Sequence, residues 1–195
     1  MPPVLTNRFA EAFAYAATLH ARQVRKGANI PYLSHLMSVA ALVLEDGGDE
    51  DEAIAGLLHD AVEDQGGKPT LEEIRRRFGE KVARIVDGCT DSDTVPKPPW
   101  RERKERYVAH VRHAAADVRR VSSADKLHNA RSILTDYRVI GDALWNRFTA
   151  SKEETLWYYR SLLEAFRVAG SGRLVDELDL VVSELEQLSG SVPAP

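Results

Sequence analysis

The stretch LLHDAVED, residues 57–64, places a histidine and three carboxylates within an otherwise apolar helical pattern. His59 and Asp60 are neighbours, and adjacent residues on a helix point about 100° apart, so both can contact one ion between their directions. Glu63 and Asp64 follow one turn later, each four residues after one member of the pair. Carboxylates gathered near an apolar helix face repel one another unless a cation compensates their charge, so the stretch indicates a divalent metal.

Two residues outside this stretch can complete a coordination sphere. His35 lies at the start of the preceding predicted helix, and Asp125 lies in the segment ADKLHN at 124–129. With His59 and Asp60 they supply two nitrogen and two oxygen ligands from three helices and leave positions open for water or substrate. This donor set suits Mn, Fe, Co or Zn better than Ca or Mg, and open positions are typical of a catalytic site. His128, three residues after Asp125, is expected only to order its helix.

Apolar residues recur at helical spacing along the chain, and we find no convincing run with the period of two that a half-buried strand shows. We therefore predict an all-α fold, a single helical bundle of about ten helices. Side-chain caps are predicted at Asn7 or Thr6, at Asp49, and in capping boxes at 70–73 and 151–154. The predicted helices cover 7–25, 33–45, 50–64, 70–79, 80–88, 100–116, 117–139, 151–169 and 173–188.

The length of 195 residues fits one domain. We predict a single domain over 1–195, with its core at about 7–169, a C-terminal helix at about 173–188 and a frayed tail at 189–195. The apolar stripe of that last helix can pack on the domain or on a second copy, so a homo-oligomer is left open. The segment 90–99 contains three prolines and is the one long loop; its role is left open.

Composition narrows the class of protein. Apolar residues make up 44% and charged residues 29%, the balance of an ordinary globular protein. Cys89 is the only cysteine, which excludes an internal disulfide and a multi-cysteine zinc site and favours a reducing, cytoplasmic location. No secretory signal is visible, and the longest apolar stretch, 36–44, is too short to span a membrane. A net charge of −4 argues against nucleic acid as a partner.

Charge is unevenly distributed along the chain. Residues 45–64 hold nine acids and no Lys or Arg, whereas residues 97–131 hold ten Lys and Arg and four acids. A metal site beside a pocket for a polyanion would show this distribution, although two solvated helix faces would show it too.

Three elements occur in one order: His35, then HDAVED at 59–64, then ADKLHNARS at 124–132. They resemble the HD-domain superfamily of metal-dependent phosphohydrolases. With RK at 25–26 and PYLSH at 31–35, they are similar to its RelA/SpoT-type hydrolase branch, especially the stand-alone small alarmone hydrolases. The resemblance covers about residues 8–167. It implies Mn²⁺-dependent hydrolysis of the 3′-pyrophosphate of ppGpp and pppGpp, small nucleotide substrates, to GDP or GTP plus pyrophosphate.

The resemblance also implies roles for individual residues. The implied metal ligands are His35, His59, Asp60 and Asp125. The implied catalytic residues are Glu63 and Asp64, which orient or deprotonate the attacking water. The implied substrate-binding residues are Arg25, Lys26, Asn129 and Ser132. Leu36 and Gln65 depart from the Pro and Thr common in the family. Two alternatives stay open: an HD phosphohydrolase for another nucleotide (an adenine analogue of the alarmone, NADPH or a nucleoside monophosphate), and a non-catalytic, nucleotide-sensing HD domain.

Overall fold

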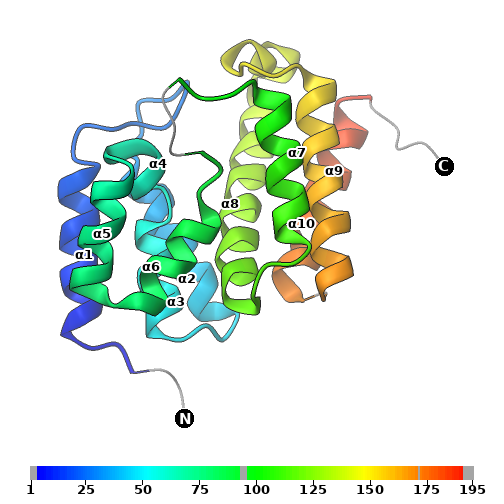
Figure 1. Ribbon diagram of the computed structural model, residues 1–195. Coiled ribbons are helices and arrows are strands. Elements are labelled where there is room, and N and C mark those ends of the chain that lie inside the picture. Colours follow the sequence, from blue (N-terminus) through cyan, green and yellow to red (C-terminus); the bar gives the residue numbers. More distant parts are fainter. Residues whose placement is uncertain (1–3, 93–95, 171, 191–195) are drawn as a thin grey trace.

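The computed structural model describes residues 4–92, 96–170 and 172–190 (Figure 1). Within these ranges the chain forms ten α-helices and one 3₁₀ helix, and an isolated bridge between Val24 and Pro31 is the only β-type pairing. The all-α prediction is therefore confirmed. The elements are α1 (Asn7–Leu19), α2 (Leu33–Glu45), α3 (Glu50–Leu58), α4 (Ala61–Gln65), α5 (Lys68–Phe78), α6 (Glu80–Cys89), α7 (Trp100–Val111), α8 (Ala116–Ile140), η1 (Gly141–Arg147), α9 (Lys152–Ala169) and α10 (Arg173–Leu188).

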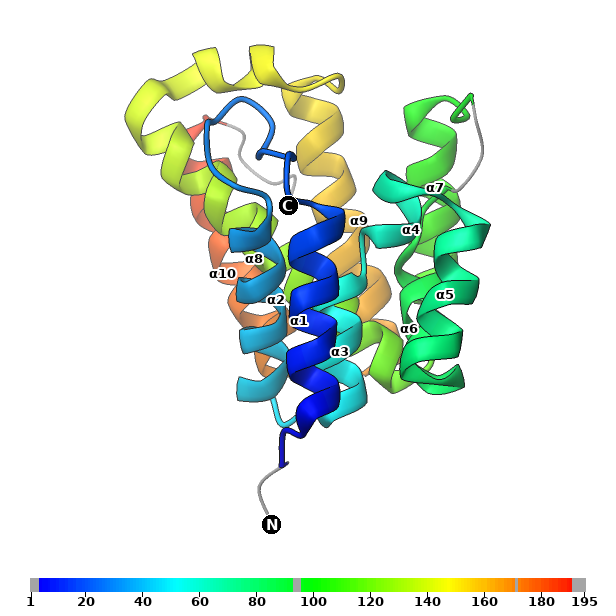
Figure 2. The ribbon, with the colours of Figure 1, turned by 90° about the vertical axis from the view of Figure 1, so that its left-hand side faces the viewer.

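The long helix α8 runs through the middle of the molecule, with α1–α6 on one side and α7, α9 and α10 on the other (Figure 1). It contacts α2, α3, α6, α9 and α10, and α1 lies against α2 and α3 (Figure 2). One hydrophobic core joins both sides, and its fully buried members include Leu36, Ile54, Leu127 and Leu162. No helix in the described ranges is long and apolar enough to cross a membrane.

The first predicted helix was wrong at its C-terminal end. Helix α1 ends at Leu19 rather than near residue 25. The chain then turns back on itself, because the Tyr32 amide donates to the Gln23 carbonyl and the Arg25 amide to the Ile30 carbonyl. This turn brings Arg25 and Lys26 onto a loop above the bundle instead of leaving them at a helix end.

The predicted helix 50–64 was also wrong, since it breaks at His59 and Asp60. Helix α3 ends at Leu58, and the short helix α4 begins at Ala61. Asp60 has φ −95° and ψ −2°, outside regular helical geometry. The two candidate ligands therefore leave the junction of two helices rather than the face of one.

Capping predictions had mixed outcomes. The Asp49 cap is confirmed, as is the capping box at 151–154, where Ser151 and Glu154 satisfy each other's backbone amides. The capping box at 70–73 was wrong, because α5 already begins at Lys68 after Gly67 and Thr70 is buried inside it. Helix α7 ends at Val111, earlier than predicted, and η1 was not predicted.

The C-terminal helix packs on the chain itself. Leu174, Leu178 and Val182 of α10 are buried, and the helix contacts α8 and α9. Of the predicted frayed segment 189–195, Ser189 follows α10 and is buried, while residues 191–195 lie outside the described ranges. The prediction that 1–195 forms a single domain stays a prediction.

Candidate active site

Four side chains from three separate parts of the chain converge inside the bundle. His35 comes from α2, His59 and Asp60 from the α3–α4 junction, and Asp125 from α8. His59 Nε2 lies 3.0 Å from Asp60 Oδ2, and His35 Nε2 lies 3.2 Å from Asp125 Oδ1. The distances from His35 Nε2 to Asp60 Oδ2 and from His59 Nε2 to Asp125 Oδ1 are both 3.6 Å. Adjacent ligands of an octahedral ion with bonds of about 2.1 Å are separated by roughly 3 Å. The spacing therefore fits one shared cation.

The chemistry of the histidines also fits a cation. Their Nε2 atoms are buried and have no hydrogen-bond partner among the described residues. Their Nδ1 atoms are engaged instead, that of His59 with the Gly56 carbonyl at 2.9 Å and that of His35 with His128 Nδ1 at 2.8 Å. A hydrogen bond donated by Nδ1 leaves a lone pair on Nε2, the usual arrangement of a metal-binding histidine. His128 thus orients a candidate ligand, a contact that the sequence did not predict.

The two carboxyls are held ionised. Burial alone would raise their pKa values, but His59 and His35 beside Asp60, and Lys126 beside Asp125, hold the pKa of both carboxyls well below the usual range. The carboxylates in turn outweigh the effect of burial on His59 and raise its pKa well above the usual value. A proton and a divalent cation therefore compete for this cluster.

A second layer of hydrogen bonds fixes the carboxylates. The Tyr32 hydroxyl donates to Asp60 Oδ2 at 2.5 Å, the Asn129 amide to Asp125 Oδ1 at 2.5 Å, and the Lys126 ammonium to Asp125 Oδ2 at 2.6 Å. Burial and the neighbouring Asp60 raise the pKa of Tyr32, so the phenol stays a donor. Roles for Tyr32 and Lys126 were missed from the sequence, although both stand within the quoted motifs.

Glu63 and Asp64 lie on α4, one turn beyond the junction. Glu63 accepts a hydrogen bond from the Lys97 ammonium at 2.6 Å, and Asp64 accepts one from the Gln23 amide at 2.7 Å. Burial raises the pKa of both carboxyls; the next largest influence is Asp91 for Glu63 and Asp60 for Asp64, and each raises the pKa further. A carboxyl with a raised pKa exchanges protons closer to neutral pH, as a general acid or base requires.

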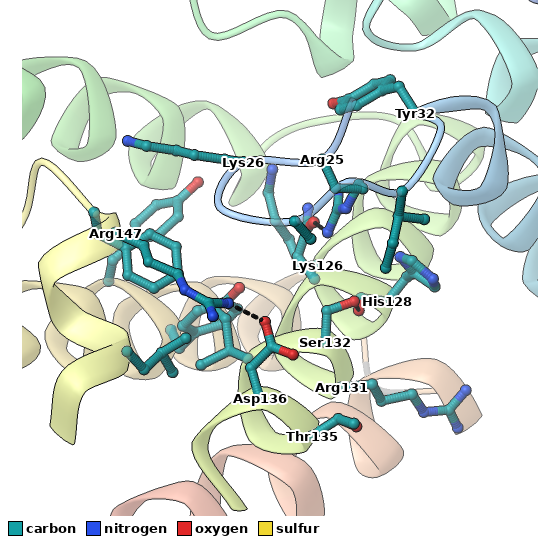
Figure 3. Close-up of a pocket in the computed structure, with 18 of the residues that line it drawn as sticks. Arg25, Lys26, Tyr32, Lys126, His128, Arg131, Ser132, Thr135, Asp136 and Arg147 are labelled. Atoms are coloured by element: carbon teal, nitrogen blue, oxygen red, sulfur yellow. Dashed lines mark hydrogen bonds and ion pairs between the residues drawn. The ribbon is translucent and has the colours of Figure 1, made fainter. Parts of the chain in front are cut away.

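The four predicted substrate-binding residues line one cavity of about 640 Å³. Figure 3 labels three of them, Arg25, Lys26 and Ser132. Arg25 and Lys26 enter it from the turn after α1, and Asn129 and Ser132 from α8. The Arg25 guanidinium donates to Asn129 Oδ1 at 2.7 Å, and Asn129 in turn donates to Asp125. His35, His59, Asp60 and Asp125 do not line the cavity themselves, but Asn129 does, and its hydrogen bond to Asp125 places the cavity beside the four-residue cluster. Four more lysines and arginines line it: Lys104, Lys126 and Arg131 come from the basic segment 97–131, and Arg147 was not predicted.

Two histidines and two aspartates converge in an all-α bundle, beside a cationic cavity. This combination is typical of metal-dependent hydrolases. A family model described as HD domain matches residues 12–153, so the chain belongs to the HD-domain family. Two curated proteins and two solved structures show what the chain is similar to.

Among curated proteins, the chain is similar to the guanosine-3′,5′-bis(diphosphate) 3′-pyrophosphohydrolase MESH1 of Xenopus tropicalis and of Homo sapiens. The two are 40% and 38% identical to it over 126 residues, which cover 63% of this chain and 68% of each relative. Among solved structures, a metazoan ortholog of SpoT superposes with a TM-score of 0.75 at 24% identity, covering 97% of this chain and 99% of that one. The protein lmo0812 of Listeria monocytogenes superposes with a TM-score of 0.71 at 29% identity, covering 78% and 99%.

Proposed function

We propose that this chain is a metal-dependent hydrolase of guanosine-3′,5′-bis(diphosphate), which it cleaves to GDP and pyrophosphate, and likewise pppGpp to GTP. One observation carries the proposal: two buried imidazole nitrogens without hydrogen-bond partners among the described residues face two ionised carboxylates, and Asn129, which bonds to one of these carboxylates, lines the adjoining cationic cavity. The MESH1 relatives, named for this reaction, match over more than half of the chain and support the substrate class.

We assign His35, His59, Asp60 and Asp125 to hold the cation, and we propose Mn²⁺, which suits their mixed nitrogen and oxygen donors. When bound, the cation supplies Lewis-acid chemistry, since it polarises phosphoryl oxygens and acidifies water. Tyr32 and Asn129 keep the two carboxylates facing the cluster through their hydrogen bonds. Such outer contacts preserve ligand geometry while the substrate comes and goes.

We assign Glu63 and Asp64 to orient and deprotonate the attacking water. Water adds to the phosphorus next to the 3′ oxygen, the bond between that phosphorus and the 3′ oxygen breaks, and the 3′ oxygen takes up a proton. The raised pKa of Asp64 makes its carboxylate a stronger base than an ordinary aspartate, and Gln23 holds the carboxylate in place. Arg25 and Lys26 offset the charge of the bound polyphosphate.

We further propose that residues 1–195 work as one HD hydrolase domain, acting in the cytoplasm on the alarmones of the stringent response. These assignments rest on the resemblance and on the single cysteine. Self-association stays an open prediction.

The test starts from metal-stripped protein incubated with ppGpp, with and without Mn²⁺, followed by chromatography of GDP and pyrophosphate. We expect both products in equal amounts only with Mn²⁺, and none from Asp60→Asn under the same conditions. Failure of the wild-type protein to release either product, with Mn²⁺ shown to be bound, would exclude the proposed reaction. A panel of the adenine analogue, NADPH and nucleoside monophosphates then tests the other nucleotides, and tight ppGpp binding without turnover would indicate a sensor.

A further inference from the structure

The cavity contains one acid among many bases. Its lining includes six lysines and arginines but a single carboxylate, Asp136, among the described residues. A cationic lining attracts a polyphosphate, whereas a carboxylate repels one. Asp136 therefore suits a part of the ligand that carries no negative charge and offers hydrogen-bond donors.

Asp136 also lies far from the metal ligands. It follows Asn129 by seven residues and Asp125 by eleven on the same helix, α8. At 1.5 Å per residue these separations are about 10 Å and about 16 Å along the helix axis. If the cleaved pyrophosphate lies at the ligands, the Asp136 end of the cavity is left for the nucleoside.

Apolar side chains line the cavity around the Asp136–Arg147 pair. Ile133 lies one turn before Asp136 on α8, and Leu144 and Phe148 flank Arg147 in and after η1; all three line the cavity. Apolar walls with one oriented polar group are typical of a site for a planar ring. At this end of the cavity a carboxylate paired with Arg147 therefore lies beside apolar side chains.

Arg147 holds the Asp136 carboxylate in place. Its Nη1 donates to Asp136 Oδ2 at 2.8 Å, as Figure 3 shows, while Asp136 Oδ1 has no partner among the described residues. The arginine stem lies against Gly27, where a Cβ atom would come within 2.5 Å of Arg147 Cδ and where φ is +74°. The turn that carries Arg25 and Lys26 therefore also positions Arg147, while, among the described residues, Asp136 Oδ1 stays free and Oδ2 keeps a lone pair for a second hydrogen bond.

We infer that Asp136 is a specificity-determining residue that accepts hydrogen bonds from N1–H and the 2-amino group of guanine; this inference rests on the proposed function. Guanine presents these two donors side by side, a match for a carboxylate. Adenine presents a ring nitrogen lone pair at the equivalent position, which a carboxylate repels. Hypoxanthine keeps N1–H but lacks the 2-amino group, so it separates the two contacts.

The experiment compares kcat/KM of the Mn²⁺-loaded protein for the guanine, hypoxanthine and adenine forms of the nucleoside 3′,5′-bis(diphosphate). We expect wild type to prefer guanine to hypoxanthine by roughly 10-fold, and to adenine by more, as loss of one or both contacts implies. Asp136→Ala and Asp136→Asn should bring the guanine-to-hypoxanthine ratio to about 2 or less, mainly through KM. Glu184→Ala is the matched control, because Glu184, like Asp136, pairs with an arginine, is similarly exposed, and lies outside the cavity lining.

An unchanged base ratio in both Asp136 variants, or equal wild-type rates with guanine and hypoxanthine, would overturn the inference and leave the proposed reaction intact. If wild type turns over none of the three, the proposed reaction fails instead. Calorimetry of GDP, IDP and ADP binding to the same proteins then measures base preference without turnover. A preference for GDP that both Asp136 variants lose supports the inference, and any other pattern contradicts it.

Discussion

The side-chain amide of Gln23 donates a 2.7 Å hydrogen bond to the carboxylate of Asp64. The Gln23 carbonyl oxygen is itself engaged by His20 Nδ1 at 2.7 Å and by the Gln65 amide at 2.6 Å, so the amide can present only its NH₂ to Asp64. His20 is buried and stacks on Tyr32, the donor to Asp60. The turn after α1 therefore positions Asp64, a candidate catalytic base, and supports Asp60, a candidate metal ligand.

Replacement of Gln23 by Leu removes the donor to Asp64. A hydrogen bond to a carboxylate favours its ionised form, so its loss raises the Asp64 pKa further above the usual value. We expect the acid limb of the kcat profile to move to higher pH and kcat on that limb to fall about 10-fold. Gln65→Leu keeps the donor to Asp64 and should move the limb less. A profile identical to that of wild type in Gln23→Leu would show that this bond does not tune the reaction.

Tyr32→Phe tests the outer contact to Asp60. The substitution keeps the ring and removes only the hydroxyl that donates to Asp60 Oδ2. Loss of such a contact lowers metal affinity by roughly 10- to 100-fold. Titration of the stripped protein with Mn²⁺ measures this change. Tyr137→Phe is the control, since the Tyr137 hydroxyl bonds to Asp142 away from the cluster; equal Mn²⁺ affinity in the two variants would contradict the role of Tyr32.

Gly56→Ala tests how closely α2 and α3 must approach. A Cβ atom at Gly56 would lie 3.1 Å from Ala40 Cα, a backbone atom of α2 that cannot move aside alone. We expect the free energy of unfolding to fall by about 1–3 kcal/mol and Mn²⁺ affinity to fall with it, because α2 carries His35 and α3 leads to His59. Urea unfolding and metal titration measure the two effects. Gly172→Ala, with open space at its Cβ, should change neither; a Gly56→Ala protein as stable as wild type would contradict the close packing.

The Asp91 carboxyl makes the free energy of unfolding depend on pH. Its buried carboxylate accepts hydrogen bonds from Arg103 at 2.7 Å and Lys104 at 2.5 Å. Burial would raise its pKa, but Lys104 and Arg103 hold the pKa below its usual value. A lowered folded-state pKa stabilises the protein above the unfolded pKa of about 4, and the contribution is lost as pH falls through the folded pKa.

We therefore expect Asp91→Asn to lower the free energy of unfolding at pH 7 by about 2 kcal/mol. The difference from wild type should shrink as pH falls below about 4. Urea unfolding at pH 7 and pH 3 measures it, with the exposed pair variant Glu184→Gln as the control. A difference of the same size at both pH values would show that the ion pair is not its source.

Local sequence signals determined most of the helices. Helix α2 has the predicted bounds of 33–45, and the caps at Asp49 and Ser151 form as predicted, because each depends on residues within one turn. The sequence motifs also predicted that His35, His59, Asp60 and Asp125 share one site. The structure brings their side chains together. Apolar periodicity and caps depend on residues that are close along the chain, so both can be predicted from the sequence alone.

Only the tertiary structure decided how the site is built. The break at His59 and Asp60 goes against continuous helical periodicity, and it lets both side chains face His35 and Asp125. The bonds from Gln23 to Asp64 and from Arg25 to Asn129 join residues 41 and 104 positions apart. Periodicity reports which face of a helix is buried but not which distant side chain meets it there, because that depends on how the helices pack against one another.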